Sequence, residues 1–284
     1  MIRARQHPNW LTPQGPVPFV SMGHGDRVVV LLHGLLGSPN NWYHVMADLA
    51  DDYRVIAPQL PVDHQPDRRQ SGICTMNELT DYIANFLFGL QLPPFVICGN
   101  SLGGLVSIEI CLRYPERVSG LVLAGSAGMY ERNLTHGVRP GPSYEFVRAI
   151  AADIFYDPAM ITNELVEEWY HAFQDRDFVR FLLRVTRATR DRTIRDELQQ
   201  LKLPTLIVWG RNDKVTPPEV AESFKNQIGT GNADLRYIDN CGHAPNLEQP
   251  ALFAEMLRKF LPVCFPGDPN TTAGLSSAPN VVAQ

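Results

Sequence analysis

Residues 95–104 read Phe-Val-Ile-Cys-Gly-Asn-Ser-Leu-Gly-Gly, and a run with helical spacing follows from Leu105 to Tyr114. The apolar run predicts a buried strand, and the G-x-S-x-G string after it predicts a tight turn into a helix. Such a turn strains the serine backbone and lifts its hydroxyl out of the sheet, while Gly99 and Gly103 avoid collisions with neighbouring backbone. Ser101 is therefore a candidate nucleophile at the end of a strand.

Short apolar runs alternate with longer segments of helical spacing on both sides of this stretch. The candidate strands are Val28–Leu32, Arg54–Ala57, Phe95–Cys98, Val118–Ala124, Thr205–Trp209 and Leu235–Ile238. This alternation predicts an α/β fold with a mostly parallel central sheet and helices on both faces. The segment Pro18–Met22 and the strand that begins at Val28 are expected to form an antiparallel hairpin at the sheet edge.

The strand signal disappears between Gly128 and Leu201, where three helices are expected: Tyr144–Phe155, Thr162–Gln174 and Asp177–Thr189. A helical block between two strands predicts an insertion that forms a lid over the carboxyl edge of the sheet. The expected division is a core over residues 1–128 and 202–261, a helical lid over 129–201 and a disordered tail over 262–284. The tail is rich in Pro, Gly, Ser, Thr and Ala.

Composition excludes several classes of function. The net charge of −5 gives no basic surface for nucleic acid, and no run of about 18 apolar residues predicts a membrane span. The basic start of the chain has no apolar segment after it, so we expect a cytoplasmic protein. The five cysteines form no C-x-x-C pair, which favours reduced thiols over a disulfide framework or a metal site.

A serine hydroxyl needs a base and a group that orients the base. Asp213 directly follows the strand Thr205–Trp209, and His243 directly follows the strand Leu235–Ile238. Both positions fall on the sheet edge expected for Ser101, where open α/β sheets bind their ligands. Taken singly, Asp213 fits a turn cap and His243 an ordinary loop histidine; taken together with Ser101, they predict a catalytic triad.

The chain resembles the α/β-hydrolase superfamily from about Val17 to Leu261. The resemblance rests on His33-Gly34 after the first parallel strand, GNSLGG at the elbow, GRNDKVTP around Asp213 and CGHAPNLEQP around His243. It implies an oxyanion hole made by the backbone N–H groups of Leu102 and Leu35, with Leu36 as the alternative to Leu35. It also implies acyl transfer without a metal or organic cofactor.

The resemblance assigns His33 to holding the oxyanion loop rather than to acting as the base. Dehalogenase-like and epoxide-hydrolase-like relatives carry Asp where this chain has Ser101, so those two chemistries are disfavoured. Relatives usually read like D-x-P-G-x-G-x-S after the strand Arg54–Ala57, whereas this chain has Pro-Gln-Leu-Pro-Val-Asp-His-Gln over residues 58–65. This departure affects the expected substrate more than the mechanism.

The favoured function is hydrolysis of a small acyl compound, such as a carboxylic ester. Asn100 resembles the G-N-S-x-G-G elbow of C–C bond hydrolases that act on ring-fission products, but the G-x-G-P-G-type loop and the Trp after the catalytic His are missing. A weakly catalytic ligand receptor is a third alternative, against which the complete triad argues. The expected substrate-binding residues are Leu36, Asn100, Trp169, Tyr170 and Phe173.

A row of arginines marks one face of the last lid helix, at positions 176, 180, 184 and 187. Such a stripe fits a solvated helix face. Steering of an anionic substrate and contact with an acidic partner remain the alternatives.

Overall fold

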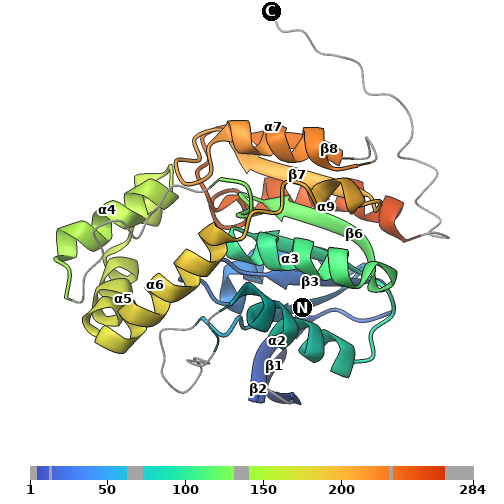
Figure 1. Cartoon of the computed structure of the whole chain (residues 1–284), viewed down its shortest axis with the longest axis horizontal. Coiled ribbons are helices and arrows are strands. Elements are labelled where there is room, and N and C mark those ends of the chain that lie inside the picture. The colour runs from blue at the N-terminus through green and yellow to red at the C-terminus, as the bar shows by residue number, and fades with distance from the viewer. Residues whose placement is uncertain are drawn as a thin grey trace, which may run out of the picture.

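An eight-stranded sheet forms the centre of the computed structural model, which describes residues 5–12, 15–62, 73, 75–130, 141–229 and 233–265 (Figure 1). The strand order is β1-β2-β4-β3-β5-β6-β7-β8, and all neighbours from β4 to β8 are parallel. The strands are β1 (Arg5–Thr12), β2 (Gly15–Met22), β3 (Val28–Leu32), β4 (Arg54–Pro58), β5 (Phe95–Asn100), β6 (Val118–Ala124), β7 (Thr205–Gly210) and β8 (Ala233–Ile238). The predicted α/β-hydrolase architecture is confirmed.

The predicted hairpin between β2 and β3 is wrong. β2 is antiparallel to β4 on one side, where Met22 lies opposite Val55, and antiparallel to β1 on the other. The link between β2 and β3 contains Gly23 at φ +72°, and a Cβ there would lie 2.1 Å from the carbonyl oxygen of Tyr53. The link thus packs on the chain that enters β4, which leaves β4 between β2 and β3.

β1 was not predicted from the sequence. Its segment carries Pro8 and lacks the alternation of apolar and polar residues that indicates a strand. The register between β1 and β2 shifts between His7 and Trp10, a bulge of the kind in which an edge strand tolerates proline.

Helices cover both faces of the sheet because the strand side chains alternate between two apolar clusters. In β3, Val28, Val30 and Leu32 face one cluster, and Val29 and Leu31 face the other. The first cluster is covered by α2 (Met76–Gly89), α3 (Leu102–Arg113) and α7 (Pro218–Gln227), and the second by α1 (Tyr43–Leu49) and α9 (Pro250–Cys264).

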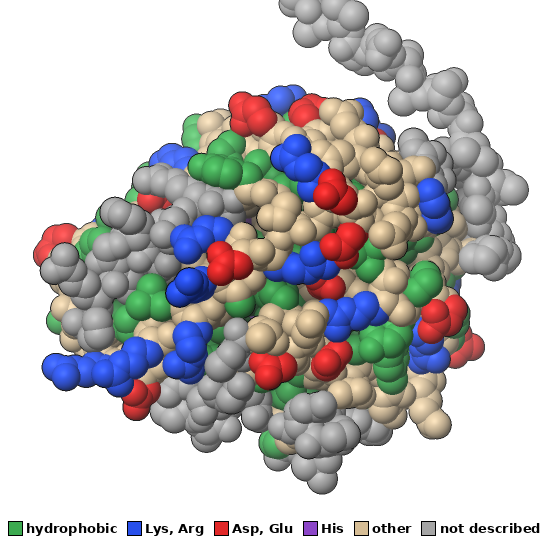
Figure 2. Space-filling view, in the orientation of Figure 1, with side chains coloured by type: hydrophobic (Ala, Val, Ile, Leu, Met, Phe, Trp, Pro, Cys, Tyr) green, Lys and Arg blue, Asp and Glu red, His purple; other side chains and the backbone are tan. Residues whose placement is uncertain are grey.

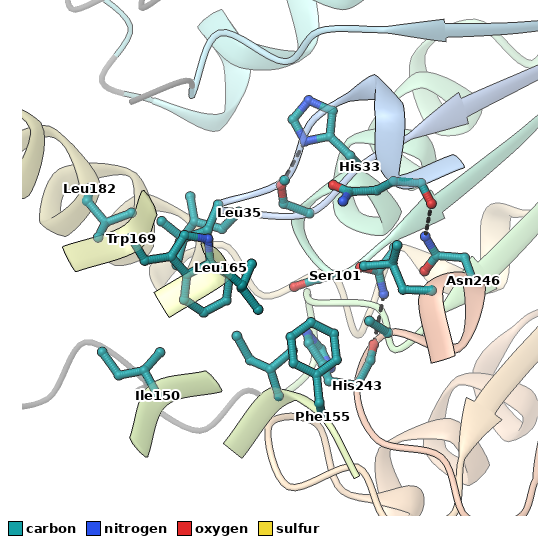
Figure 3. A pocket seen from close by; sticks show the side chains of 18 of the residues that line it. His33, Leu35, Ser101, Ile150, Phe155, Leu165, Trp169, Leu182, His243 and Asn246 are labelled. Carbon is teal, nitrogen blue, oxygen red and sulfur yellow. Dashed lines mark hydrogen bonds between the residues drawn. The ribbon is translucent and has the colours of Figure 1, made fainter. Parts of the chain in front are cut away.

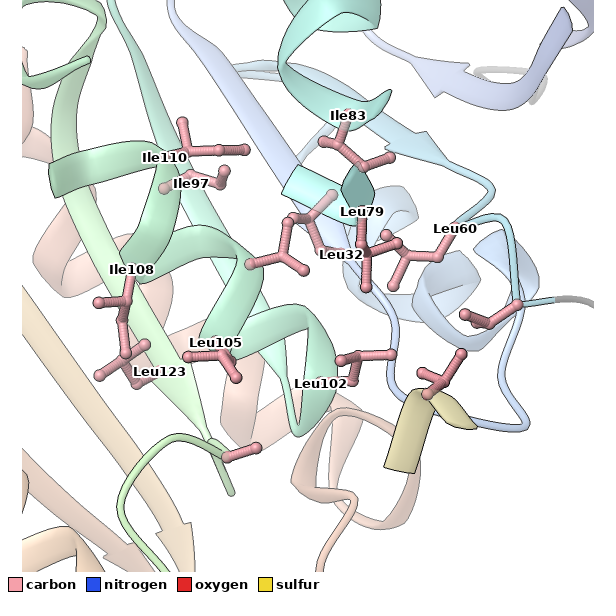
Figure 4. Packing of buried hydrophobic residues seen from close by; sticks show 14 of the residues in the cluster. Leu32, Leu60, Leu79, Ile83, Ile97, Leu102, Leu105, Ile108, Ile110 and Leu123 are labelled. Carbon is pink, nitrogen blue, oxygen red and sulfur yellow. The ribbon is translucent and has the colours of Figure 1, made fainter. Parts of the chain in front are cut away.

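The first cluster supports the start of α3, the helix that follows Ser101. Figure 4 shows Leu102 and Leu105 of α3 near Leu32 of β3, with Leu79 and Ile83 of α2 on the other side. All five side chains are buried. Removing a buried leucine from such a core typically costs about 2–5 kcal/mol, so this packing fixes the position of the turn before α3.

Three helices lie between β6 and β7 in the chain and pack together at one end of the sheet, on the left in Figure 1. They are α4 (Tyr144–Ile154), α5 (Asn163–Gln174) and α6 (Arg176–Asp191). Their side-chain caps agree with the sequence: Ser143 accepts a hydrogen bond from the Phe146 N–H and Thr162 from the Leu165 N–H. We call residues 129–201 the insertion.

The predicted boundary of the tail needs a correction. Helix α9 continues three residues beyond Leu261, through Pro262 to Cys264, and Cys264 is 2 % exposed. The rest of the predicted tail, residues 266–284, lies outside the described residues. Among the helices that the structure describes, none is both long and apolar enough to cross a membrane.

Candidate active site

Ser101 lies in the sharp turn between β5 and α3. Its backbone has φ 53° and ψ −118°, a strained conformation that an ordinary residue rarely adopts. A Cβ on Gly99 would lie 2.1 Å from the carbonyl oxygen of Gly103, and a Cβ on Gly103 would lie 2.3 Å from that of Leu32. Only glycine therefore fits at these two positions, as the sequence motif predicted.

Asp213 and His243 meet at the carboxyl edge of the sheet. His243 Nδ1 lies 2.9 Å from Asp213 Oδ2, and the side chains are 6 % and 0 % exposed. Asp213 Oδ1 accepts hydrogen bonds from the N–H groups of Val215 and Thr216, and the Thr216 hydroxyl donates to Oδ2. Because these donors hold the carboxylate, Asp213 presents a fixed acceptor to the imidazole.

The backbone of His243 is held on both sides. Its N–H donates to the carbonyl oxygen of Ile154 at the end of α4, and its carbonyl oxygen accepts a hydrogen bond from Asn100 Nδ2 at 2.9 Å. The same Asn100 amide donates to the carbonyl oxygen of Ala124. Asn100 was predicted to bind substrate, and it lines the pocket, but its amide also joins the loop that carries His243 to the end of β6.

Glu248, in α8 (Pro245–Glu248), was missed by the sequence analysis although it lies in a motif quoted there. Its carboxylate accepts hydrogen bonds from the N–H groups of Tyr156 at 2.7 Å and Gly242 at 2.9 Å. Burial raises the pKa of Glu248, an effect that these backbone donors oppose. The carboxylate thus joins the His243 loop to the chain that follows α4.

His33 joins the loop that follows β3 to the segment that follows β4. The N–H of Leu60 donates to His33 Nε2 at 2.9 Å, so Nε2 carries no proton and Nδ1 donates to the carbonyl oxygen of Gly34 at 2.8 Å. Gln59 Nε2 lies 3.1 Å from His33 Nε2. The unusual segment after β4 therefore supports the loop after β3 through Gln59 and Leu60, a use that the family pattern did not predict.

The expected oxyanion donors lie at the ends of two elements. Leu102 is the first residue of α3, and the first N–H groups of a helix have no partner within it. Leu35 and Leu36 lie in the loop after β3, where the Gly37 N–H donates to the Gly34 carbonyl oxygen and Leu36 has φ 60°. Both leucines line the same pocket as Ser101 and His243.

The pocket above Ser101 encloses about 980 Å³, including its open mouth. Side chains from the insertion form one wall, and Figure 3 shows them on one side of Ser101, with His33 and Asn246 on the other. This apolar wall consists of Ile150, Phe155, Leu165, Trp169, Phe173 and Leu182. No lysine or arginine is among the described residues that line the pocket.

Two of the three aromatic residues predicted to bind substrate line the pocket. Trp169 and Phe173 do, and both are more than nine-tenths buried. Tyr170 does not; its ring packs against Tyr144 of α4 with the ring centroids 5.8 Å apart. The prediction for Tyr170 is wrong because successive residues of a helix point about 100° apart, which turns this side chain out of the pocket.

The arginine stripe lies on the outer face of α6. Figure 2 shows basic side chains in a row over the position that α6 has in Figure 1. Arg180 pairs with Asp177 and Arg187 with Asp191, and these arginine side chains are 66 % and 78 % exposed. The inner face of the same helix contributes Leu182 and Thr186 to the pocket, so the stripe does not reach the candidate site.

Several known proteins resemble this chain along most of its length. 2-Hydroxy-6-oxo-2,4-heptadienoate hydrolase of Pseudomonas putida is 30 % identical over 256 residues, which cover 84 % of this chain and 90 % of that protein. The uncharacterized hydrolase YugF of Bacillus subtilis is 26 % identical over 249 residues, with the same two coverages. A solved meta-cleavage product hydrolase from Pseudomonas fluorescens IP01 has a TM-score of 0.75 at 26 % identity, over 90 % of this chain and 97 % of that one.

The sequence profile of the alpha/beta hydrolase family matches residues 29–256, which run from the second residue of β3 into the first half of α9. The strand order, the elbow at Ser101 and the relatives agree with this match. The chain therefore belongs to the alpha/beta hydrolase family.

Proposed function

We propose that this hydrolase cleaves an uncharged carboxylic ester through an acyl-enzyme on Ser101. The observation that carries the proposal is the His243–Asp213 hydrogen bond of 2.9 Å beside a pocket that Ser101 and His243 both line. An imidazole oriented by a buried carboxylate is the base that a serine nucleophile requires. The strained turn at Ser101 supports the same role.

In the first step, Ser101 Oγ attacks the ester carbonyl carbon while His243 Nε2 takes the hydroxyl proton. The N–H groups of Leu102 and Leu35 bind the oxyanion, and removal of one such donor typically lowers the rate by about 10²–10³. Asp213 stabilises the imidazolium that forms. His243 then donates its proton to the leaving alcohol, and the acyl group stays on Ser101.

In the second step, water attacks the acyl-enzyme with His243 again as the base, which releases the carboxylic acid and restores Ser101. The acyl group packs against the apolar wall that the insertion forms. In this proposal the insertion acts as the lid of the site, because Trp169, Phe173 and Leu182 all belong to it and line the pocket.

Hydrolysis of a C–C bond is the second candidate, because a relative at 30 % identity is a heptadienoate hydrolase and Asn100 precedes the nucleophile. The name of that relative's substrate denotes a carboxylate. The described pocket lining offers no lysine or arginine to bind a carboxylate, and a buried charge without a partner is costly. This observation favours an uncharged ester.

The proposal is tested with a series of p-nitrophenyl esters of increasing acyl length. We expect turnover by the wild type, loss of turnover in Ser101→Ala and no effect of Ser223→Ala, a change at a partly exposed serine on α7. Covalent labelling of Ser101 by a fluorophosphonate gives a readout that does not depend on the substrate.

Each pattern of results points to one candidate. Labelling without ester turnover, together with cleavage of 2-hydroxy-6-oxo-2,4-heptadienoate, would favour the C–C hydrolase. Neither labelling nor turnover would contradict the serine mechanism and favour a ligand receptor.

A further inference from the structure

Two asparagines lie against each other at the polar end of the pocket. Asn41 belongs to η1 (Pro39–Trp42) and Asn246 to α8, and both line the pocket. Asn246 Nδ2 donates to the backbone carbonyl oxygen of Asn41 at 3.2 Å, so the other end of the amide is the carbonyl oxygen. Figure 3 shows Asn246 on the opposite side of Ser101 from Trp169 and Leu182.

The pair offers one acceptor and one donor. Asn246 is 3 % exposed, and its Oδ1 is buried without a hydrogen-bond partner in the part of the chain that the structure describes. Such an orphaned carbonyl is rare in native proteins and calls for a partner. Asn41 Oδ1 accepts a hydrogen bond from the Ser38 N–H at 2.6 Å, which leaves Asn41 Nδ2 as a donor.

The two asparagines lie on the side of the pocket where the leaving alcohol is expected. His243 must protonate the leaving oxygen, and Asn246 follows His243 by three residues on the same segment. The apolar wall lies across Ser101 and suits the acyl chain. The alcohol part of an ester would therefore extend toward Asn41 and Asn246.

We propose that Asn41 and Asn246 bind a free hydroxyl on the alcohol part of the substrate, so that the enzyme prefers esters of alcohols that carry a second hydroxyl. This inference rests on the ester hydrolysis proposed above. A hydroxyl can donate to Asn246 Oδ1 and accept from Asn41 Nδ2 at once. A carboxylate would face the Asn246 oxygen without a proton to donate, and an alkyl group would leave both asparagines unsatisfied.

Three esters with one common acyl chain test the preference, with the chain taken from the best p-nitrophenyl substrate. The first has a 2-hydroxyethyl alcohol. The second has a propyl alcohol, which replaces the hydroxyl by a methyl group of similar size. The third has a 2-methoxyethyl alcohol, which keeps the electron-withdrawing oxygen but cannot donate a hydrogen bond. The quantity compared is kcat/KM.

We expect the wild type to hydrolyse the hydroxyethyl ester about 10- to 100-fold better than the other two, because a site that binds a hydroxyl rejects analogues without one. Asn246→Leu removes the acceptor at similar size, so in this variant the ratio of kcat/KM for the hydroxyethyl ester to that for the propyl ester falls to near one. Asn40→Leu, the same change at an exposed neighbour, keeps the wild-type ratio.

Two results would overturn the inference alone: turnover of all three esters by the wild type without preference, or a preference that survives in Asn246→Leu. The ratio of kcat/KM between the esters in the wild type still tests the inference if Asn246→Leu does not fold. Absence of turnover of all three esters, and of the p-nitrophenyl series, would instead overturn the ester hydrolysis and this inference with it.

Discussion

The Asp213 carboxylate accepts hydrogen bonds from three donors besides its contact with His243. The N–H groups of Val215 and Thr216 and the Thr216 hydroxyl all donate to its carboxylate, at 2.8–2.9 Å. Because backbone donors cannot reverse their direction, they determine which oxygen faces His243. The arrangement thus specifies the proton on His243 Nδ1 and makes Nε2 the nitrogen that would act as the base in the proposed mechanism.

Asp213→Asn tests this orientation. The two backbone N–H groups hold the amide oxygen of the new side chain, so its NH₂ group faces His243 Nδ1 and favours the tautomer that carries the proton on Nε2. We expect kcat to fall by about 10⁴, as for the equivalent change in serine proteases, with little loss of stability. Burst kinetics with a p-nitrophenyl ester measure the acylation step. Asp239→Asn, at a 78 % exposed carboxylate, is the control and should retain full activity.

Glu248→Ala tests the positioning of His243. Loss of the carboxylate leaves the N–H groups of Tyr156 and Gly242 without their acceptor, so we expect the free energy of unfolding to fall by about 1–3 kcal/mol. We also expect a lower kcat with a nearly unchanged KM, because His243 loses its support and the pocket wall remains. Denaturation and steady-state kinetics measure the two effects. Equal effects from Glu255→Ala, at an exposed residue of α9, would contradict this role.

At the scale of elements, the end of the insertion is attached to α3 by an ion-pair network around the buried Glu109. Arg192 follows α6 directly, and its Nε lies 2.5 Å from Glu109 Oε1, while its terminal nitrogens bind Glu197. Glu109 is 3 % exposed and lies on the helix that begins after Ser101. The hydrogen bond from Arg192 lowers the pKa of Glu197.

Arg192→Met should lower the free energy of unfolding by about 2–3 kcal/mol, because it leaves the buried Glu109 with Arg113 as its remaining partner. The lowered pKa of Glu197 means that its contribution is present above the unfolded-state pKa and disappears as pH falls through the folded-state value. The loss of wild-type stability on acidification should therefore be shallower in the variant. Urea denaturation between pH 7 and pH 3 measures both effects, and Arg190→Met, an exposed neighbour, should match the wild type.

At the scale of the whole molecule, every parallel strand and the three helices of the insertion could be predicted from the sequence. These elements depend on local patterns of apolar residues, which a single chain displays. The pairing of β2 with β4 depends on contacts between distant segments, so the neighbouring apolar runs suggested the wrong hairpin. The bulged strand β1 had no pattern to detect.

The candidate site also contains residues that the sequence predicts and residues that only the fold reveals. Ser101, Asp213 and His243 lie in short motifs and were predicted from them, whereas the supports of His243 come from other parts of the chain. Asn100 reaches the His243 carbonyl across 143 positions, and Tyr156 donates to Glu248 across 92. Asn246 could have been flagged as a polar residue close to His243, but its orphaned oxygen is visible only in the fold.

Truncation tests where the folded domain ends. Deletion of residues 266–284 should leave the melting temperature and the proposed esterase activity unchanged. Deletion from residue 262 also removes Cys264, whose sulfur packs against Gly120 of β6, so it should cost about 1–2 kcal/mol. Differential scanning calorimetry measures both variants. A loss of stability in the shorter deletion would show that the domain extends beyond Phe265.

The contacts between α4 and the His243 loop bear on how this enzyme can be altered. On the α4 side they use the carbonyl oxygen of Ile154 and the N–H of Tyr156, which every residue type except proline can supply. The side chains of Ile154 and Tyr156 therefore take no part in these two hydrogen bonds. Substitutions in α4–α6 can therefore change the pocket wall without displacing His243. The same holds for an exchange of α4–α6 between relatives.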